Sequence, residues 1–302
     1  MANNSKHTYG GQAVIEGVMI RGKSHYSLAV RRPDGTITTI IEPLNHIFTS
    51  KFRSVPLLRG ILVLAETLSM GIKSLHKSSI LSVENVDDIE EKPISNLSLI
   101  LTIIFSVGIA IIIFFITPVV LLEIVDNFLP SPLISNILEG ILRLVILVAY
   151  VAVIGFFPDI KRVYQYHGAE HMSIHALEAD EQLTVSAVKK YPTPHPRCGT
   201  AFLLTVMVVS IFIFSLLGET TFLGRIISRI ILIPVIASIS YEIIRYAGTH
   251  KHSLVSAIVS QPGLLLQRIT TQTPDDSQIE VAISAVTAVI EADNNELAEP
   301  SN

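Results

Sequence analysis

The residues best suited to chemistry lie together in the segment from 167 to 178, His-Gly-Ala-Glu-His-Met-Ser-Ile-His-Ala-Leu-Glu. If this segment is an α-helix, one of its faces consists of positions that an amphipathic helix normally fills with apolar residues. Here those positions hold His167, Glu170, His171, Ile174, His175 and Glu178. Burying unpaired imidazole and carboxylate groups is costly, so the face must meet water, charged partners or a metal ion. Both groups are ligands of divalent cations, and the pattern therefore predicts a metal site.

The motif His-x-x-Glu-His has the inverted zincin pattern, in which two histidines hold zinc and the glutamate activates water. The spacing i, i+4 places the imidazoles of His167 and His171 on one face, about 6 Å apart at Cβ, which suits chelation. We therefore predict His167 and His171 as metal ligands and Glu170 as the catalytic base. Zinc is the expected cofactor, with iron and manganese as alternatives.

The sequence leaves several candidates for the remaining metal ligands, namely His175, Glu178, His195 and Cys198. Two His-x-x-Glu pairs along one stripe would also suit a dinuclear carboxylate–histidine site. The alternative without a metal is a polar face whose groups hydrogen-bond to one another beside the membrane. Cys198 and His195 could also form a nucleophile pair, although a lone cysteine between apolar residues is more often a packed thiol.

The segment 191–200, Tyr-Pro-Thr-Pro-His-Pro-Arg-Cys-Gly-Thr, is not expected to be a regular helix, because its prolines lack the backbone donor. We interpret it as an ordered link that brings His195 and Cys198 to the membrane surface. Arg197, within the same link, is expected to line the site.

The glycine-rich segment 9–22 has Gln12, Glu16 and Arg21 as its polar members. It lacks the Lys-Ser/Thr ending of a phosphate-binding P-loop, so we expect no nucleotide cofactor. A strand–turn unit with unusual backbone angles explains the glycines. We expect Glu16, between Ile15 and Gly17, to point into the site.

The composition indicates a membrane protein. Of the 302 residues, 49% are hydrophobic and only 16% charged, and the mean hydropathy is +0.54, whereas soluble proteins carry about 25% charged residues. A bilayer core is crossed by about 20 apolar residues in a helix. We predict an α-helical polytopic membrane protein with four transmembrane helices, at 97–122, 137–157, 200–217 and 225–245.

Basic residues are distributed unevenly around these spans. The loop between the first span and the apolar run that begins at Ile141 contains Glu123, Asp126 and Glu139 but no Lys or Arg. Basic residues are abundant before the first span and again between the second and third, where Lys161, Arg162, Lys189, Lys190 and Arg197 lie. By the positive-inside rule, the N-terminus, the His/Glu helix and the C-terminus are cytoplasmic, in a multi-pass protein of the cell (inner or plasma) membrane.

The parts outside the spans are expected to form a small α+β cytoplasmic domain. Residues 1–55 are read as a β-rich unit with runs at 13–20, 26–31 and 36–41, separated by turn residues such as Pro33-Asp34-Gly35. An amphipathic helix and an acidic linker occupy 56–96, and the His/Glu helix with the proline-rich link occupies 158–199. Residues 246–302 include an amphipathic helix that should pack on the N-terminal unit.

Three charged residues that lie within or at the edges of the predicted spans, Arg143, Glu242 and Arg245, are functional candidates by default. For Glu242 and Arg245, at i and i+3, we expect a helix-end ion pair. Arg225 and Arg229 are expected to extend to the membrane interface.

Six sequence blocks carry a family resemblance: Gly10-Gly-Gln-Ala-Val-Ile-Glu-Gly-Val-Met, Pro56-Leu-Leu-Arg-Gly60, Tyr166-His-Gly-Ala-Glu-His171, His195-Pro-Arg-Cys-Gly-Thr200, Ser240-Tyr-Glu-Ile243 and Pro274-Asp-Asp-Ser-Gln-Ile-Glu280. Together they resemble the YqhQ-like family, bacterial proteins of unknown function described as predicted metal-dependent enzymes. The resemblance runs from about residue 9 to residue 290. It implies a metal-dependent role for His167, Glu170 and His171, with His195 and Cys198 in the second block.

The leading hypothesis is a metal-dependent, hydrolase-like enzyme that acts on a membrane-associated peptide or lipid at the cytoplasmic membrane surface. The alternative is a non-enzymatic scaffold or membrane-protein biogenesis factor whose His/Glu face binds a structural metal or a partner protein. An ion transporter is less favoured, because the imidazole and carboxylate groups cluster outside the spans. Membrane lipids, and potentially membrane proteins, are the expected partners, and nucleic acid is not.

Overall fold

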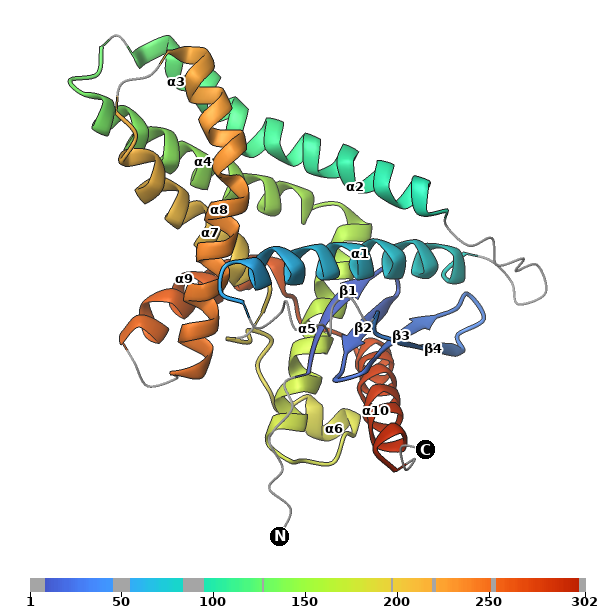
Figure 1. The fold of residues 1–302 in the computed structure, drawn as a ribbon. Helices are drawn as coiled ribbons and strands as arrows, with labels where there is room; N and C mark the ends of the chain where they lie inside the picture. The colour runs from blue at the N-terminus through green and yellow to red at the C-terminus, as the bar shows by residue number, and fades with distance from the viewer. Residues whose placement is uncertain are drawn as a thin grey trace.

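A small β-sheet and a set of long apolar helices occupy different regions of the molecule (Figure 1). The computed structural model describes residues 9–45, 55–83, 95–126, 128–196, 198–218, 221–250 and 254–298. Most of the predicted acidic linker, residues 84–94, lies outside the described residues. The described chain is mostly helical.

The sheet is a four-stranded antiparallel meander of β1 (Gly10–Val14), β2 (Gly17–Arg21), β3 (His25–Arg31) and β4 (Ile37–Pro43), in that order. The single run predicted from 13 to 20 is wrong, because the chain turns at Ile15 and Glu16 and Val14 pairs with Gly17. Glu16, the second residue of this two-residue turn, has a φ of 49°, in the left-handed region. Gly35, with a φ of 84°, plays the same part in the turn after β3.

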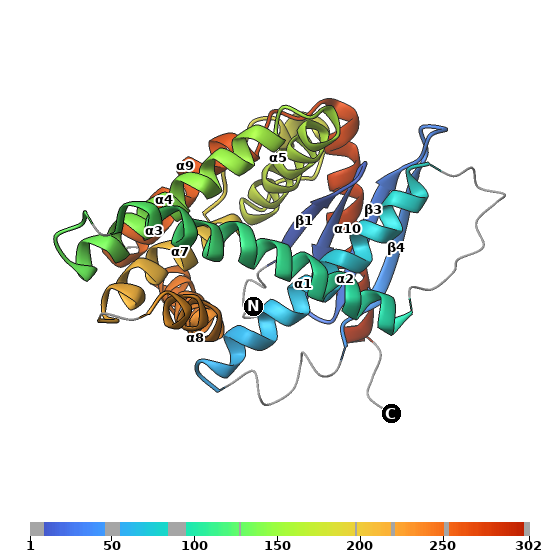
Figure 2. The same cartoon turned by 90° about the horizontal axis from the view of Figure 1, so that it is seen from above.

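Helices cover both faces of the sheet. One face packs on α5 (Pro158–Glu178) and α10 (Asp276–Ala298) through Val18, Ile20 and Ala29. The other face packs on α1 (Leu58–Leu81), where Met19 and Leu28 meet Met70. This division follows from the alternation of side chains along a strand. Figure 2 shows α10 running alongside the sheet, and the apolar stripe of α10 is buried there.

Three helical segments are long and apolar enough to cross a membrane: Ile100–Ile124, Pro132–Ile154 and Phe222–Ala247. They belong to α2 (Asn96–Ile111) with α3 (Thr117–Asp126), to α4 (Pro132–Ile154) and to α8 (Phe222–Thr249). The predicted third span appears as α7 (Thr200–Ser215), which has 16 residues and is about 24 Å long. It is therefore shorter than a typical bilayer core of about 30 Å, and it packs against α4 and α8.

A π-helical turn, Ile112–Ile116, joins α2 to α3. It precedes Pro118, which has no backbone N–H to donate to the carbonyl of Phe114. The guanidinium of Arg143 donates to that carbonyl instead, with Nε 2.8 Å from the oxygen. Arg143 thus satisfies an acceptor that the proline leaves unpaired.

Arg143 also belongs to a buried charge cluster with Glu139 and Arg229. The carboxylate of Glu139 lies 2.5 Å from Arg143 Nη2 and 2.6 Å from Arg229 Nη2, and all three side chains are at most 1% exposed. Two predictions are therefore wrong: Glu139 is in α4 rather than in a loop, and Arg229 does not extend to the interface.

The charges near the ends of the apolar helices also pair differently from the prediction. Glu242 accepts hydrogen bonds from Arg59 of α1, with Nε 2.7 Å from Oε1, so its pairing with Arg245 is not the main contact. Arg225 lies 3.6 Å from Glu123. The Arg59–Glu242 pair attaches α1 to α8 and so links the sheet to the apolar helices.

The remaining elements surround the His/Glu helix. Helix α5 follows α4 after a short break at 155–157, and the short helix α6 (Val185–Val188) packs against its end. Helix α9 (Leu254–Thr270) packs on α7 and α8 and ends beside α5. The predicted motif segment is therefore enclosed by the sheet, by α9 and by the link that leads into α7.

Candidate metal centre

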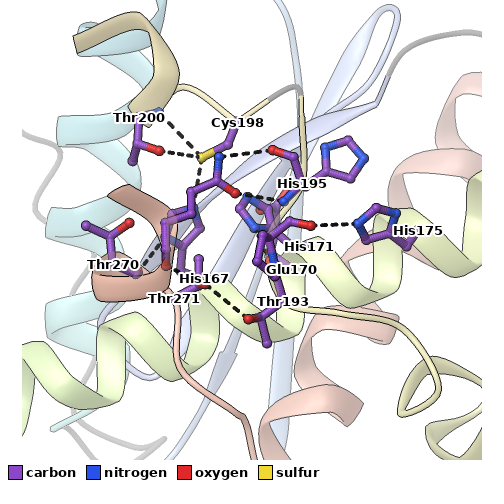
Figure 3. A network of polar contacts seen from close by, with 12 residues as sticks. His167, Glu170, His171, His175, Thr193, His195, Cys198, Thr200, Thr270 and Thr271 are labelled. Atoms are coloured by element: carbon purple, nitrogen blue, oxygen red, sulfur yellow. Dashed lines mark hydrogen bonds and ion pairs between the residues drawn. The ribbon is translucent and has the colours of Figure 1, made fainter. Parts of the chain in front are cut away.

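The His/Glu face of α5 is buried against backbone carbonyls from two other segments (Figure 3). Glu170 and His171 are only 4% and 2% exposed. Helix α5 begins with Pro158 at its first turn, where a proline costs no hydrogen bond. The imidazoles of His167 and His171 follow one another along it, with ring centroids 4.3 Å apart.

The hydrogen bonds of His167 fix which nitrogen carries its proton. Nδ1 lies 2.9 Å from the carbonyl oxygen of Thr270, at the end of α9. A carbonyl can only accept, so Nδ1 donates, and Nε2 of the neutral ring keeps its lone pair. That nitrogen lies 3.2 Å from Sγ of Cys198.

His171 is held in the same way. Its Nδ1 donates to the carbonyl of Thr193 over 2.6 Å, which leaves Nε2 unprotonated and 3.4 Å from Glu170 Oε2. Burial, followed by repulsion from the neighbouring His167, lowers the pKa of His171 to about 2. The ring is therefore neutral at physiological pH, the state in which imidazole binds a metal.

Cys198 reaches these imidazoles because the proline-rich link is anchored at His195. The His195 backbone N–H donates to Gln267 Oε1 over 2.7 Å, and Gln267 Nε2 donates back to the His195 carbonyl over 3.0 Å. Burial raises the pKa of the Cys198 thiol, although hydrogen bonds from Thr200 act in the opposite direction. Cys198 lies two residues before the start of α7, at the boundary of the apolar region.

The donor atoms of His167, His171 and Cys198 all lie within 4.8 Å of one another. Imidazole nitrogen and cysteine sulfur are both zinc ligands, and zinc sites with three protein ligands keep a fourth position for water or substrate. Each imidazole also donates its other N–H to a carbonyl, the arrangement that orients metal-ligating histidines. The donor chemistry therefore fits a divalent metal such as zinc.

Glu170 lies beside this cluster in a dry environment. Burial raises its pKa to about 7, against opposing effects of His167 and of the Gly11 backbone N–H. A side chain at Gly11 would bring Cβ to 3.0 Å from Glu170 Cγ and 2.5 Å from the carbonyl oxygen of Met19. The glycine is thus what allows β1 to approach the carboxyl group.

The other predicted ligands form a second group further along α5. The rings of His175 and His195 have centroids 4.4 Å apart, and His195 Nε2 lies 3.5 Å from Glu178 Oε1. His175 Nε2 donates to the carbonyl of Pro194. Among the described residues, the set of donors close enough together for one metal is that of His167, His171 and Cys198.

Of the predicted site-lining residues, Glu16 lies away from the cluster and Arg197 is not among the described residues. Glu16 forms an ion pair with Arg162, 2.5 Å apart, and accepts a hydrogen bond from the Tyr166 hydroxyl, rather than lining the site. The turn that places Glu16 was not recognised in the sequence, which explains the difference.

A cavity of about 230 Å³ extends from the cluster of His167, His171 and Cys198 to the sheet and α1. From the cluster side it is lined by Glu170, His171, His195 and Cys198, and from β2 and α1 by Arg21, Thr67 and Met70 among others. Arg21 is held by Glu66 of α1, through Nε and Nη2 at 3.1 and 3.0 Å from Oε1. Sequence reasoning missed Glu66 and Thr67, although a glutamate on the buried face of an amphipathic helix is a detectable signal.

A family model described as protein of unknown function (DUF1385) matches residues 55–292. The uncharacterized protein YqhQ of Bacillus subtilis (strain 168) is 35% identical over 295 residues, which cover 93% of this chain and 93% of that protein. This chain belongs to the DUF1385 family. No solved structure matches it.

The DUF1385 match includes all three residues of the cluster, His167, His171 and Cys198. It begins after the sheet, so β1 and β2, which supply Gly11 and Arg21 to the cavity, precede the matched residues. The similarity to YqhQ extends further and spans almost the whole of both chains. The residues that line the cavity of this DUF1385 protein therefore come partly from the matched segment and partly from the strands that precede it.

Proposed function

We propose that this DUF1385 protein is a metal-dependent, hydrolase-like enzyme that acts on a membrane-associated peptide or lipid. The observation that carries the proposal is the cavity of about 230 Å³ that reaches Glu170, His171 and Cys198. A purely structural metal site is normally closed by four protein ligands, whereas a catalytic one keeps access for water and substrate.

In the proposed reaction, His167, His171 and Cys198 hold the metal. When bound, a zinc ion supplies a Lewis acid that makes water a nucleophile near neutral pH. The carboxyl group of Glu170, with a pKa raised to about 7, is suited to take a proton from that water and to return it to the leaving group. The carbonyls of Thr270 and Thr193 keep both imidazoles in the ligating tautomer.

We further propose four membrane spans, with α7 as the third, and a cytoplasmic site. The excess of Lys and Arg before the first span and around α5 supports this orientation. Burial of α7 among its neighbours is compatible with its short length, because it need not match the lipid thickness alone. Cys198, next to the start of α7, would then lie close to the membrane surface, within reach of membrane lipids and membrane proteins.

The test is the metal content of the protein, purified in detergent without a histidine tag and analysed by mass spectrometry. We expect about one equivalent of zinc, iron or manganese in the unmodified protein and none in the His167→Ala/His171→Ala variant. The double variant His76→Ala/His250→Ala, which removes two exposed histidines outside the site, should retain the metal. Absence of metal from the unmodified protein, also after reconstitution with each ion, would contradict the proposal.

A further inference from the structure

We propose that Arg21 binds an oxyanion of the substrate, a phosphate or a carboxylate, in the cavity beside His171 and Cys198. The inference rests on the proposed function in treating this cavity as a substrate site. Arg21 is the one lysine or arginine among the described residues that line the cavity. Arginine presents a planar fork of N–H donors that matches both oxyanions.

The guanidinium of Arg21 is held in place before any ligand arrives. Its Nε and Nη2 donate to a single oxygen of Glu66, and its Nη1 donates to the Gly22 carbonyl over 3.1 Å. Glu66 is buried, whereas the Arg21 side chain is 30% exposed. Described partners thus take three of the five N–H groups, and two remain for a ligand.

The surroundings favour a small polar group. Gln12 and Thr67 line the same cavity and supply further hydrogen-bonding groups, and Gly10 and Gly11 keep side chains out of it. A volume of about 230 Å³ corresponds to about seven or eight water molecules. This space accommodates an oxyanion with a short connecting chain, and not a whole lipid.

The pairing of the Arg21 and Glu66 charges determines how tightly an oxyanion is expected to bind. Glu66 already neutralises Arg21, so binding of a single oxyanion should be weak in the unmodified protein. The variant Glu66→Gln keeps an oxygen acceptor for the guanidinium but removes the opposing charge. It should therefore bind an oxyanion more tightly, whereas Arg21→Gln should bind it more weakly.

The single cysteine of the chain offers a direct test, because Cys198 lines this cavity. The rate of Cys198 alkylation by iodoacetamide would be measured in protein freed of metal with a neutral chelator, at increasing concentrations of inorganic phosphate or of acetate. Without metal, the result is independent of whether the proposed metal chemistry is correct.

We expect saturable protection of Cys198 by phosphate or acetate. Arg21→Gln should raise the half-protecting concentration by about tenfold or more, the effect of losing a charged hydrogen bond, and Glu66→Gln should lower it. The matched control is Arg31→Gln, which breaks the surface pair of Arg31 with Glu280 and should leave protection unchanged. No protection in the unmodified protein, or protection that persists in Arg21→Gln, would overturn the proposal.

A second arm distinguishes the source of the oxyanion. Alkylation would be compared in nanodiscs of phosphatidylcholine with and without phosphatidic acid, with no phosphate added. Slower alkylation with phosphatidic acid, abolished by Arg21→Gln, would support a lipid headgroup. Protection by soluble phosphate or acetate alone would support a soluble or peptide-borne oxyanion.

Discussion

At the scale of single residues, the proposed third metal ligand, Cys198, is the sharpest point to test. The thiol of Cys198 lies 3.2 Å from His167 Nε2, whereas His175 donates to the Pro194 carbonyl, away from the cluster. We predict that Cys198→Ser lowers the affinity for zinc by at least about tenfold, because a hydroxyl replaces a soft anionic ligand. His175→Ala should change it little. Competition with a fluorescent zinc chelator measures both, and equal losses in the two variants would contradict the assignment.

Glu170 gives a prediction about pH. Its folded-state pKa of about 7 lies above the ordinary value of 4.5, so the folded protein binds this proton more tightly than the unfolded chain does. Its contribution to the free energy of unfolding is therefore lost as pH rises from about 4.5 to 7, by on the order of 3 kcal/mol. In metal-free protein, Glu170→Gln should raise the melting temperature more at about pH 8 than at about pH 5. An equal shift at both pH values would count against the raised pKa.

Part of this site could be predicted from the sequence, because its ligands repeat at helical spacing. His167, Glu170 and His171 lie on one turn of α5, and local geometry alone brings them together. The choice of Cys198 among the candidate third ligands depends on how the link folds and on its anchor at Gln267, which no local pattern encodes. Arg21 and Glu66 meet across two elements, so their role in the cavity depends on tertiary structure.

At the scale of elements, the close crossing at Gly168 positions the site. A Cβ there would lie 2.1 Å from the carbonyl oxygen of Gln272, which follows the end of α9 two residues after Thr270, whose carbonyl accepts from His167. We predict that Gly168→Ala destabilises the protein by about 1–3 kcal/mol, despite the higher helix propensity of alanine. It should also weaken metal binding, because the carbonyl that orients His167 is displaced.

The matched control for this prediction is Gly108→Ala in α2. A Cβ at Gly108 has no neighbour within 4 Å among the described residues, so the substitution should leave the melting temperature unchanged or slightly higher. Thermal unfolding followed by circular dichroism in detergent compares the two variants. A Gly168→Ala protein as stable as the parent would show that the crossing can relax without cost.

The elements themselves were predictable where a periodic pattern covers a long segment. The His/Glu helix and the long apolar helices follow from such patterns. The two-residue turn at Ile15–Glu16 was missed because a non-glycine residue adopts the left-handed conformation there, without the usual Asn-Gly signal. Glu139 was wrongly assigned to a loop because a charged residue was assumed to lie outside the membrane span. In the structure its carboxylate is buried because it pairs with Arg143 and Arg229.

At the scale of the whole molecule, the buried charge cluster holds the apolar helices in register. Glu139 of α4 bridges Arg143 of α4 and Arg229 of α8, and Arg143 also donates to Ser210 of α7 and to the Phe114 carbonyl in the π-helical turn. One carboxylate therefore supports contacts among four segments. The aromatic rings of Phe115 and Phe214 cover the guanidinium of Arg143, with centroids 5.0 Å from Cζ.

We predict that Glu139→Gln destabilises the folded protein strongly, on the order of 3–5 kcal/mol, because it leaves two buried guanidinium groups without a carboxylate. Glu123→Gln is the control, since it removes a carboxylate that is 46% exposed and pairs with Arg225 at the start of α8, and it should cost at most about 1 kcal/mol. The fraction of monodisperse protein after heating in detergent, measured by size-exclusion chromatography, compares the variants. If Glu139→Gln were as heat-stable as Glu123→Gln, the buried charge cluster would not be what fixes the arrangement of the helices. The position of α7, and therefore that of Cys198, would then depend on apolar packing alone.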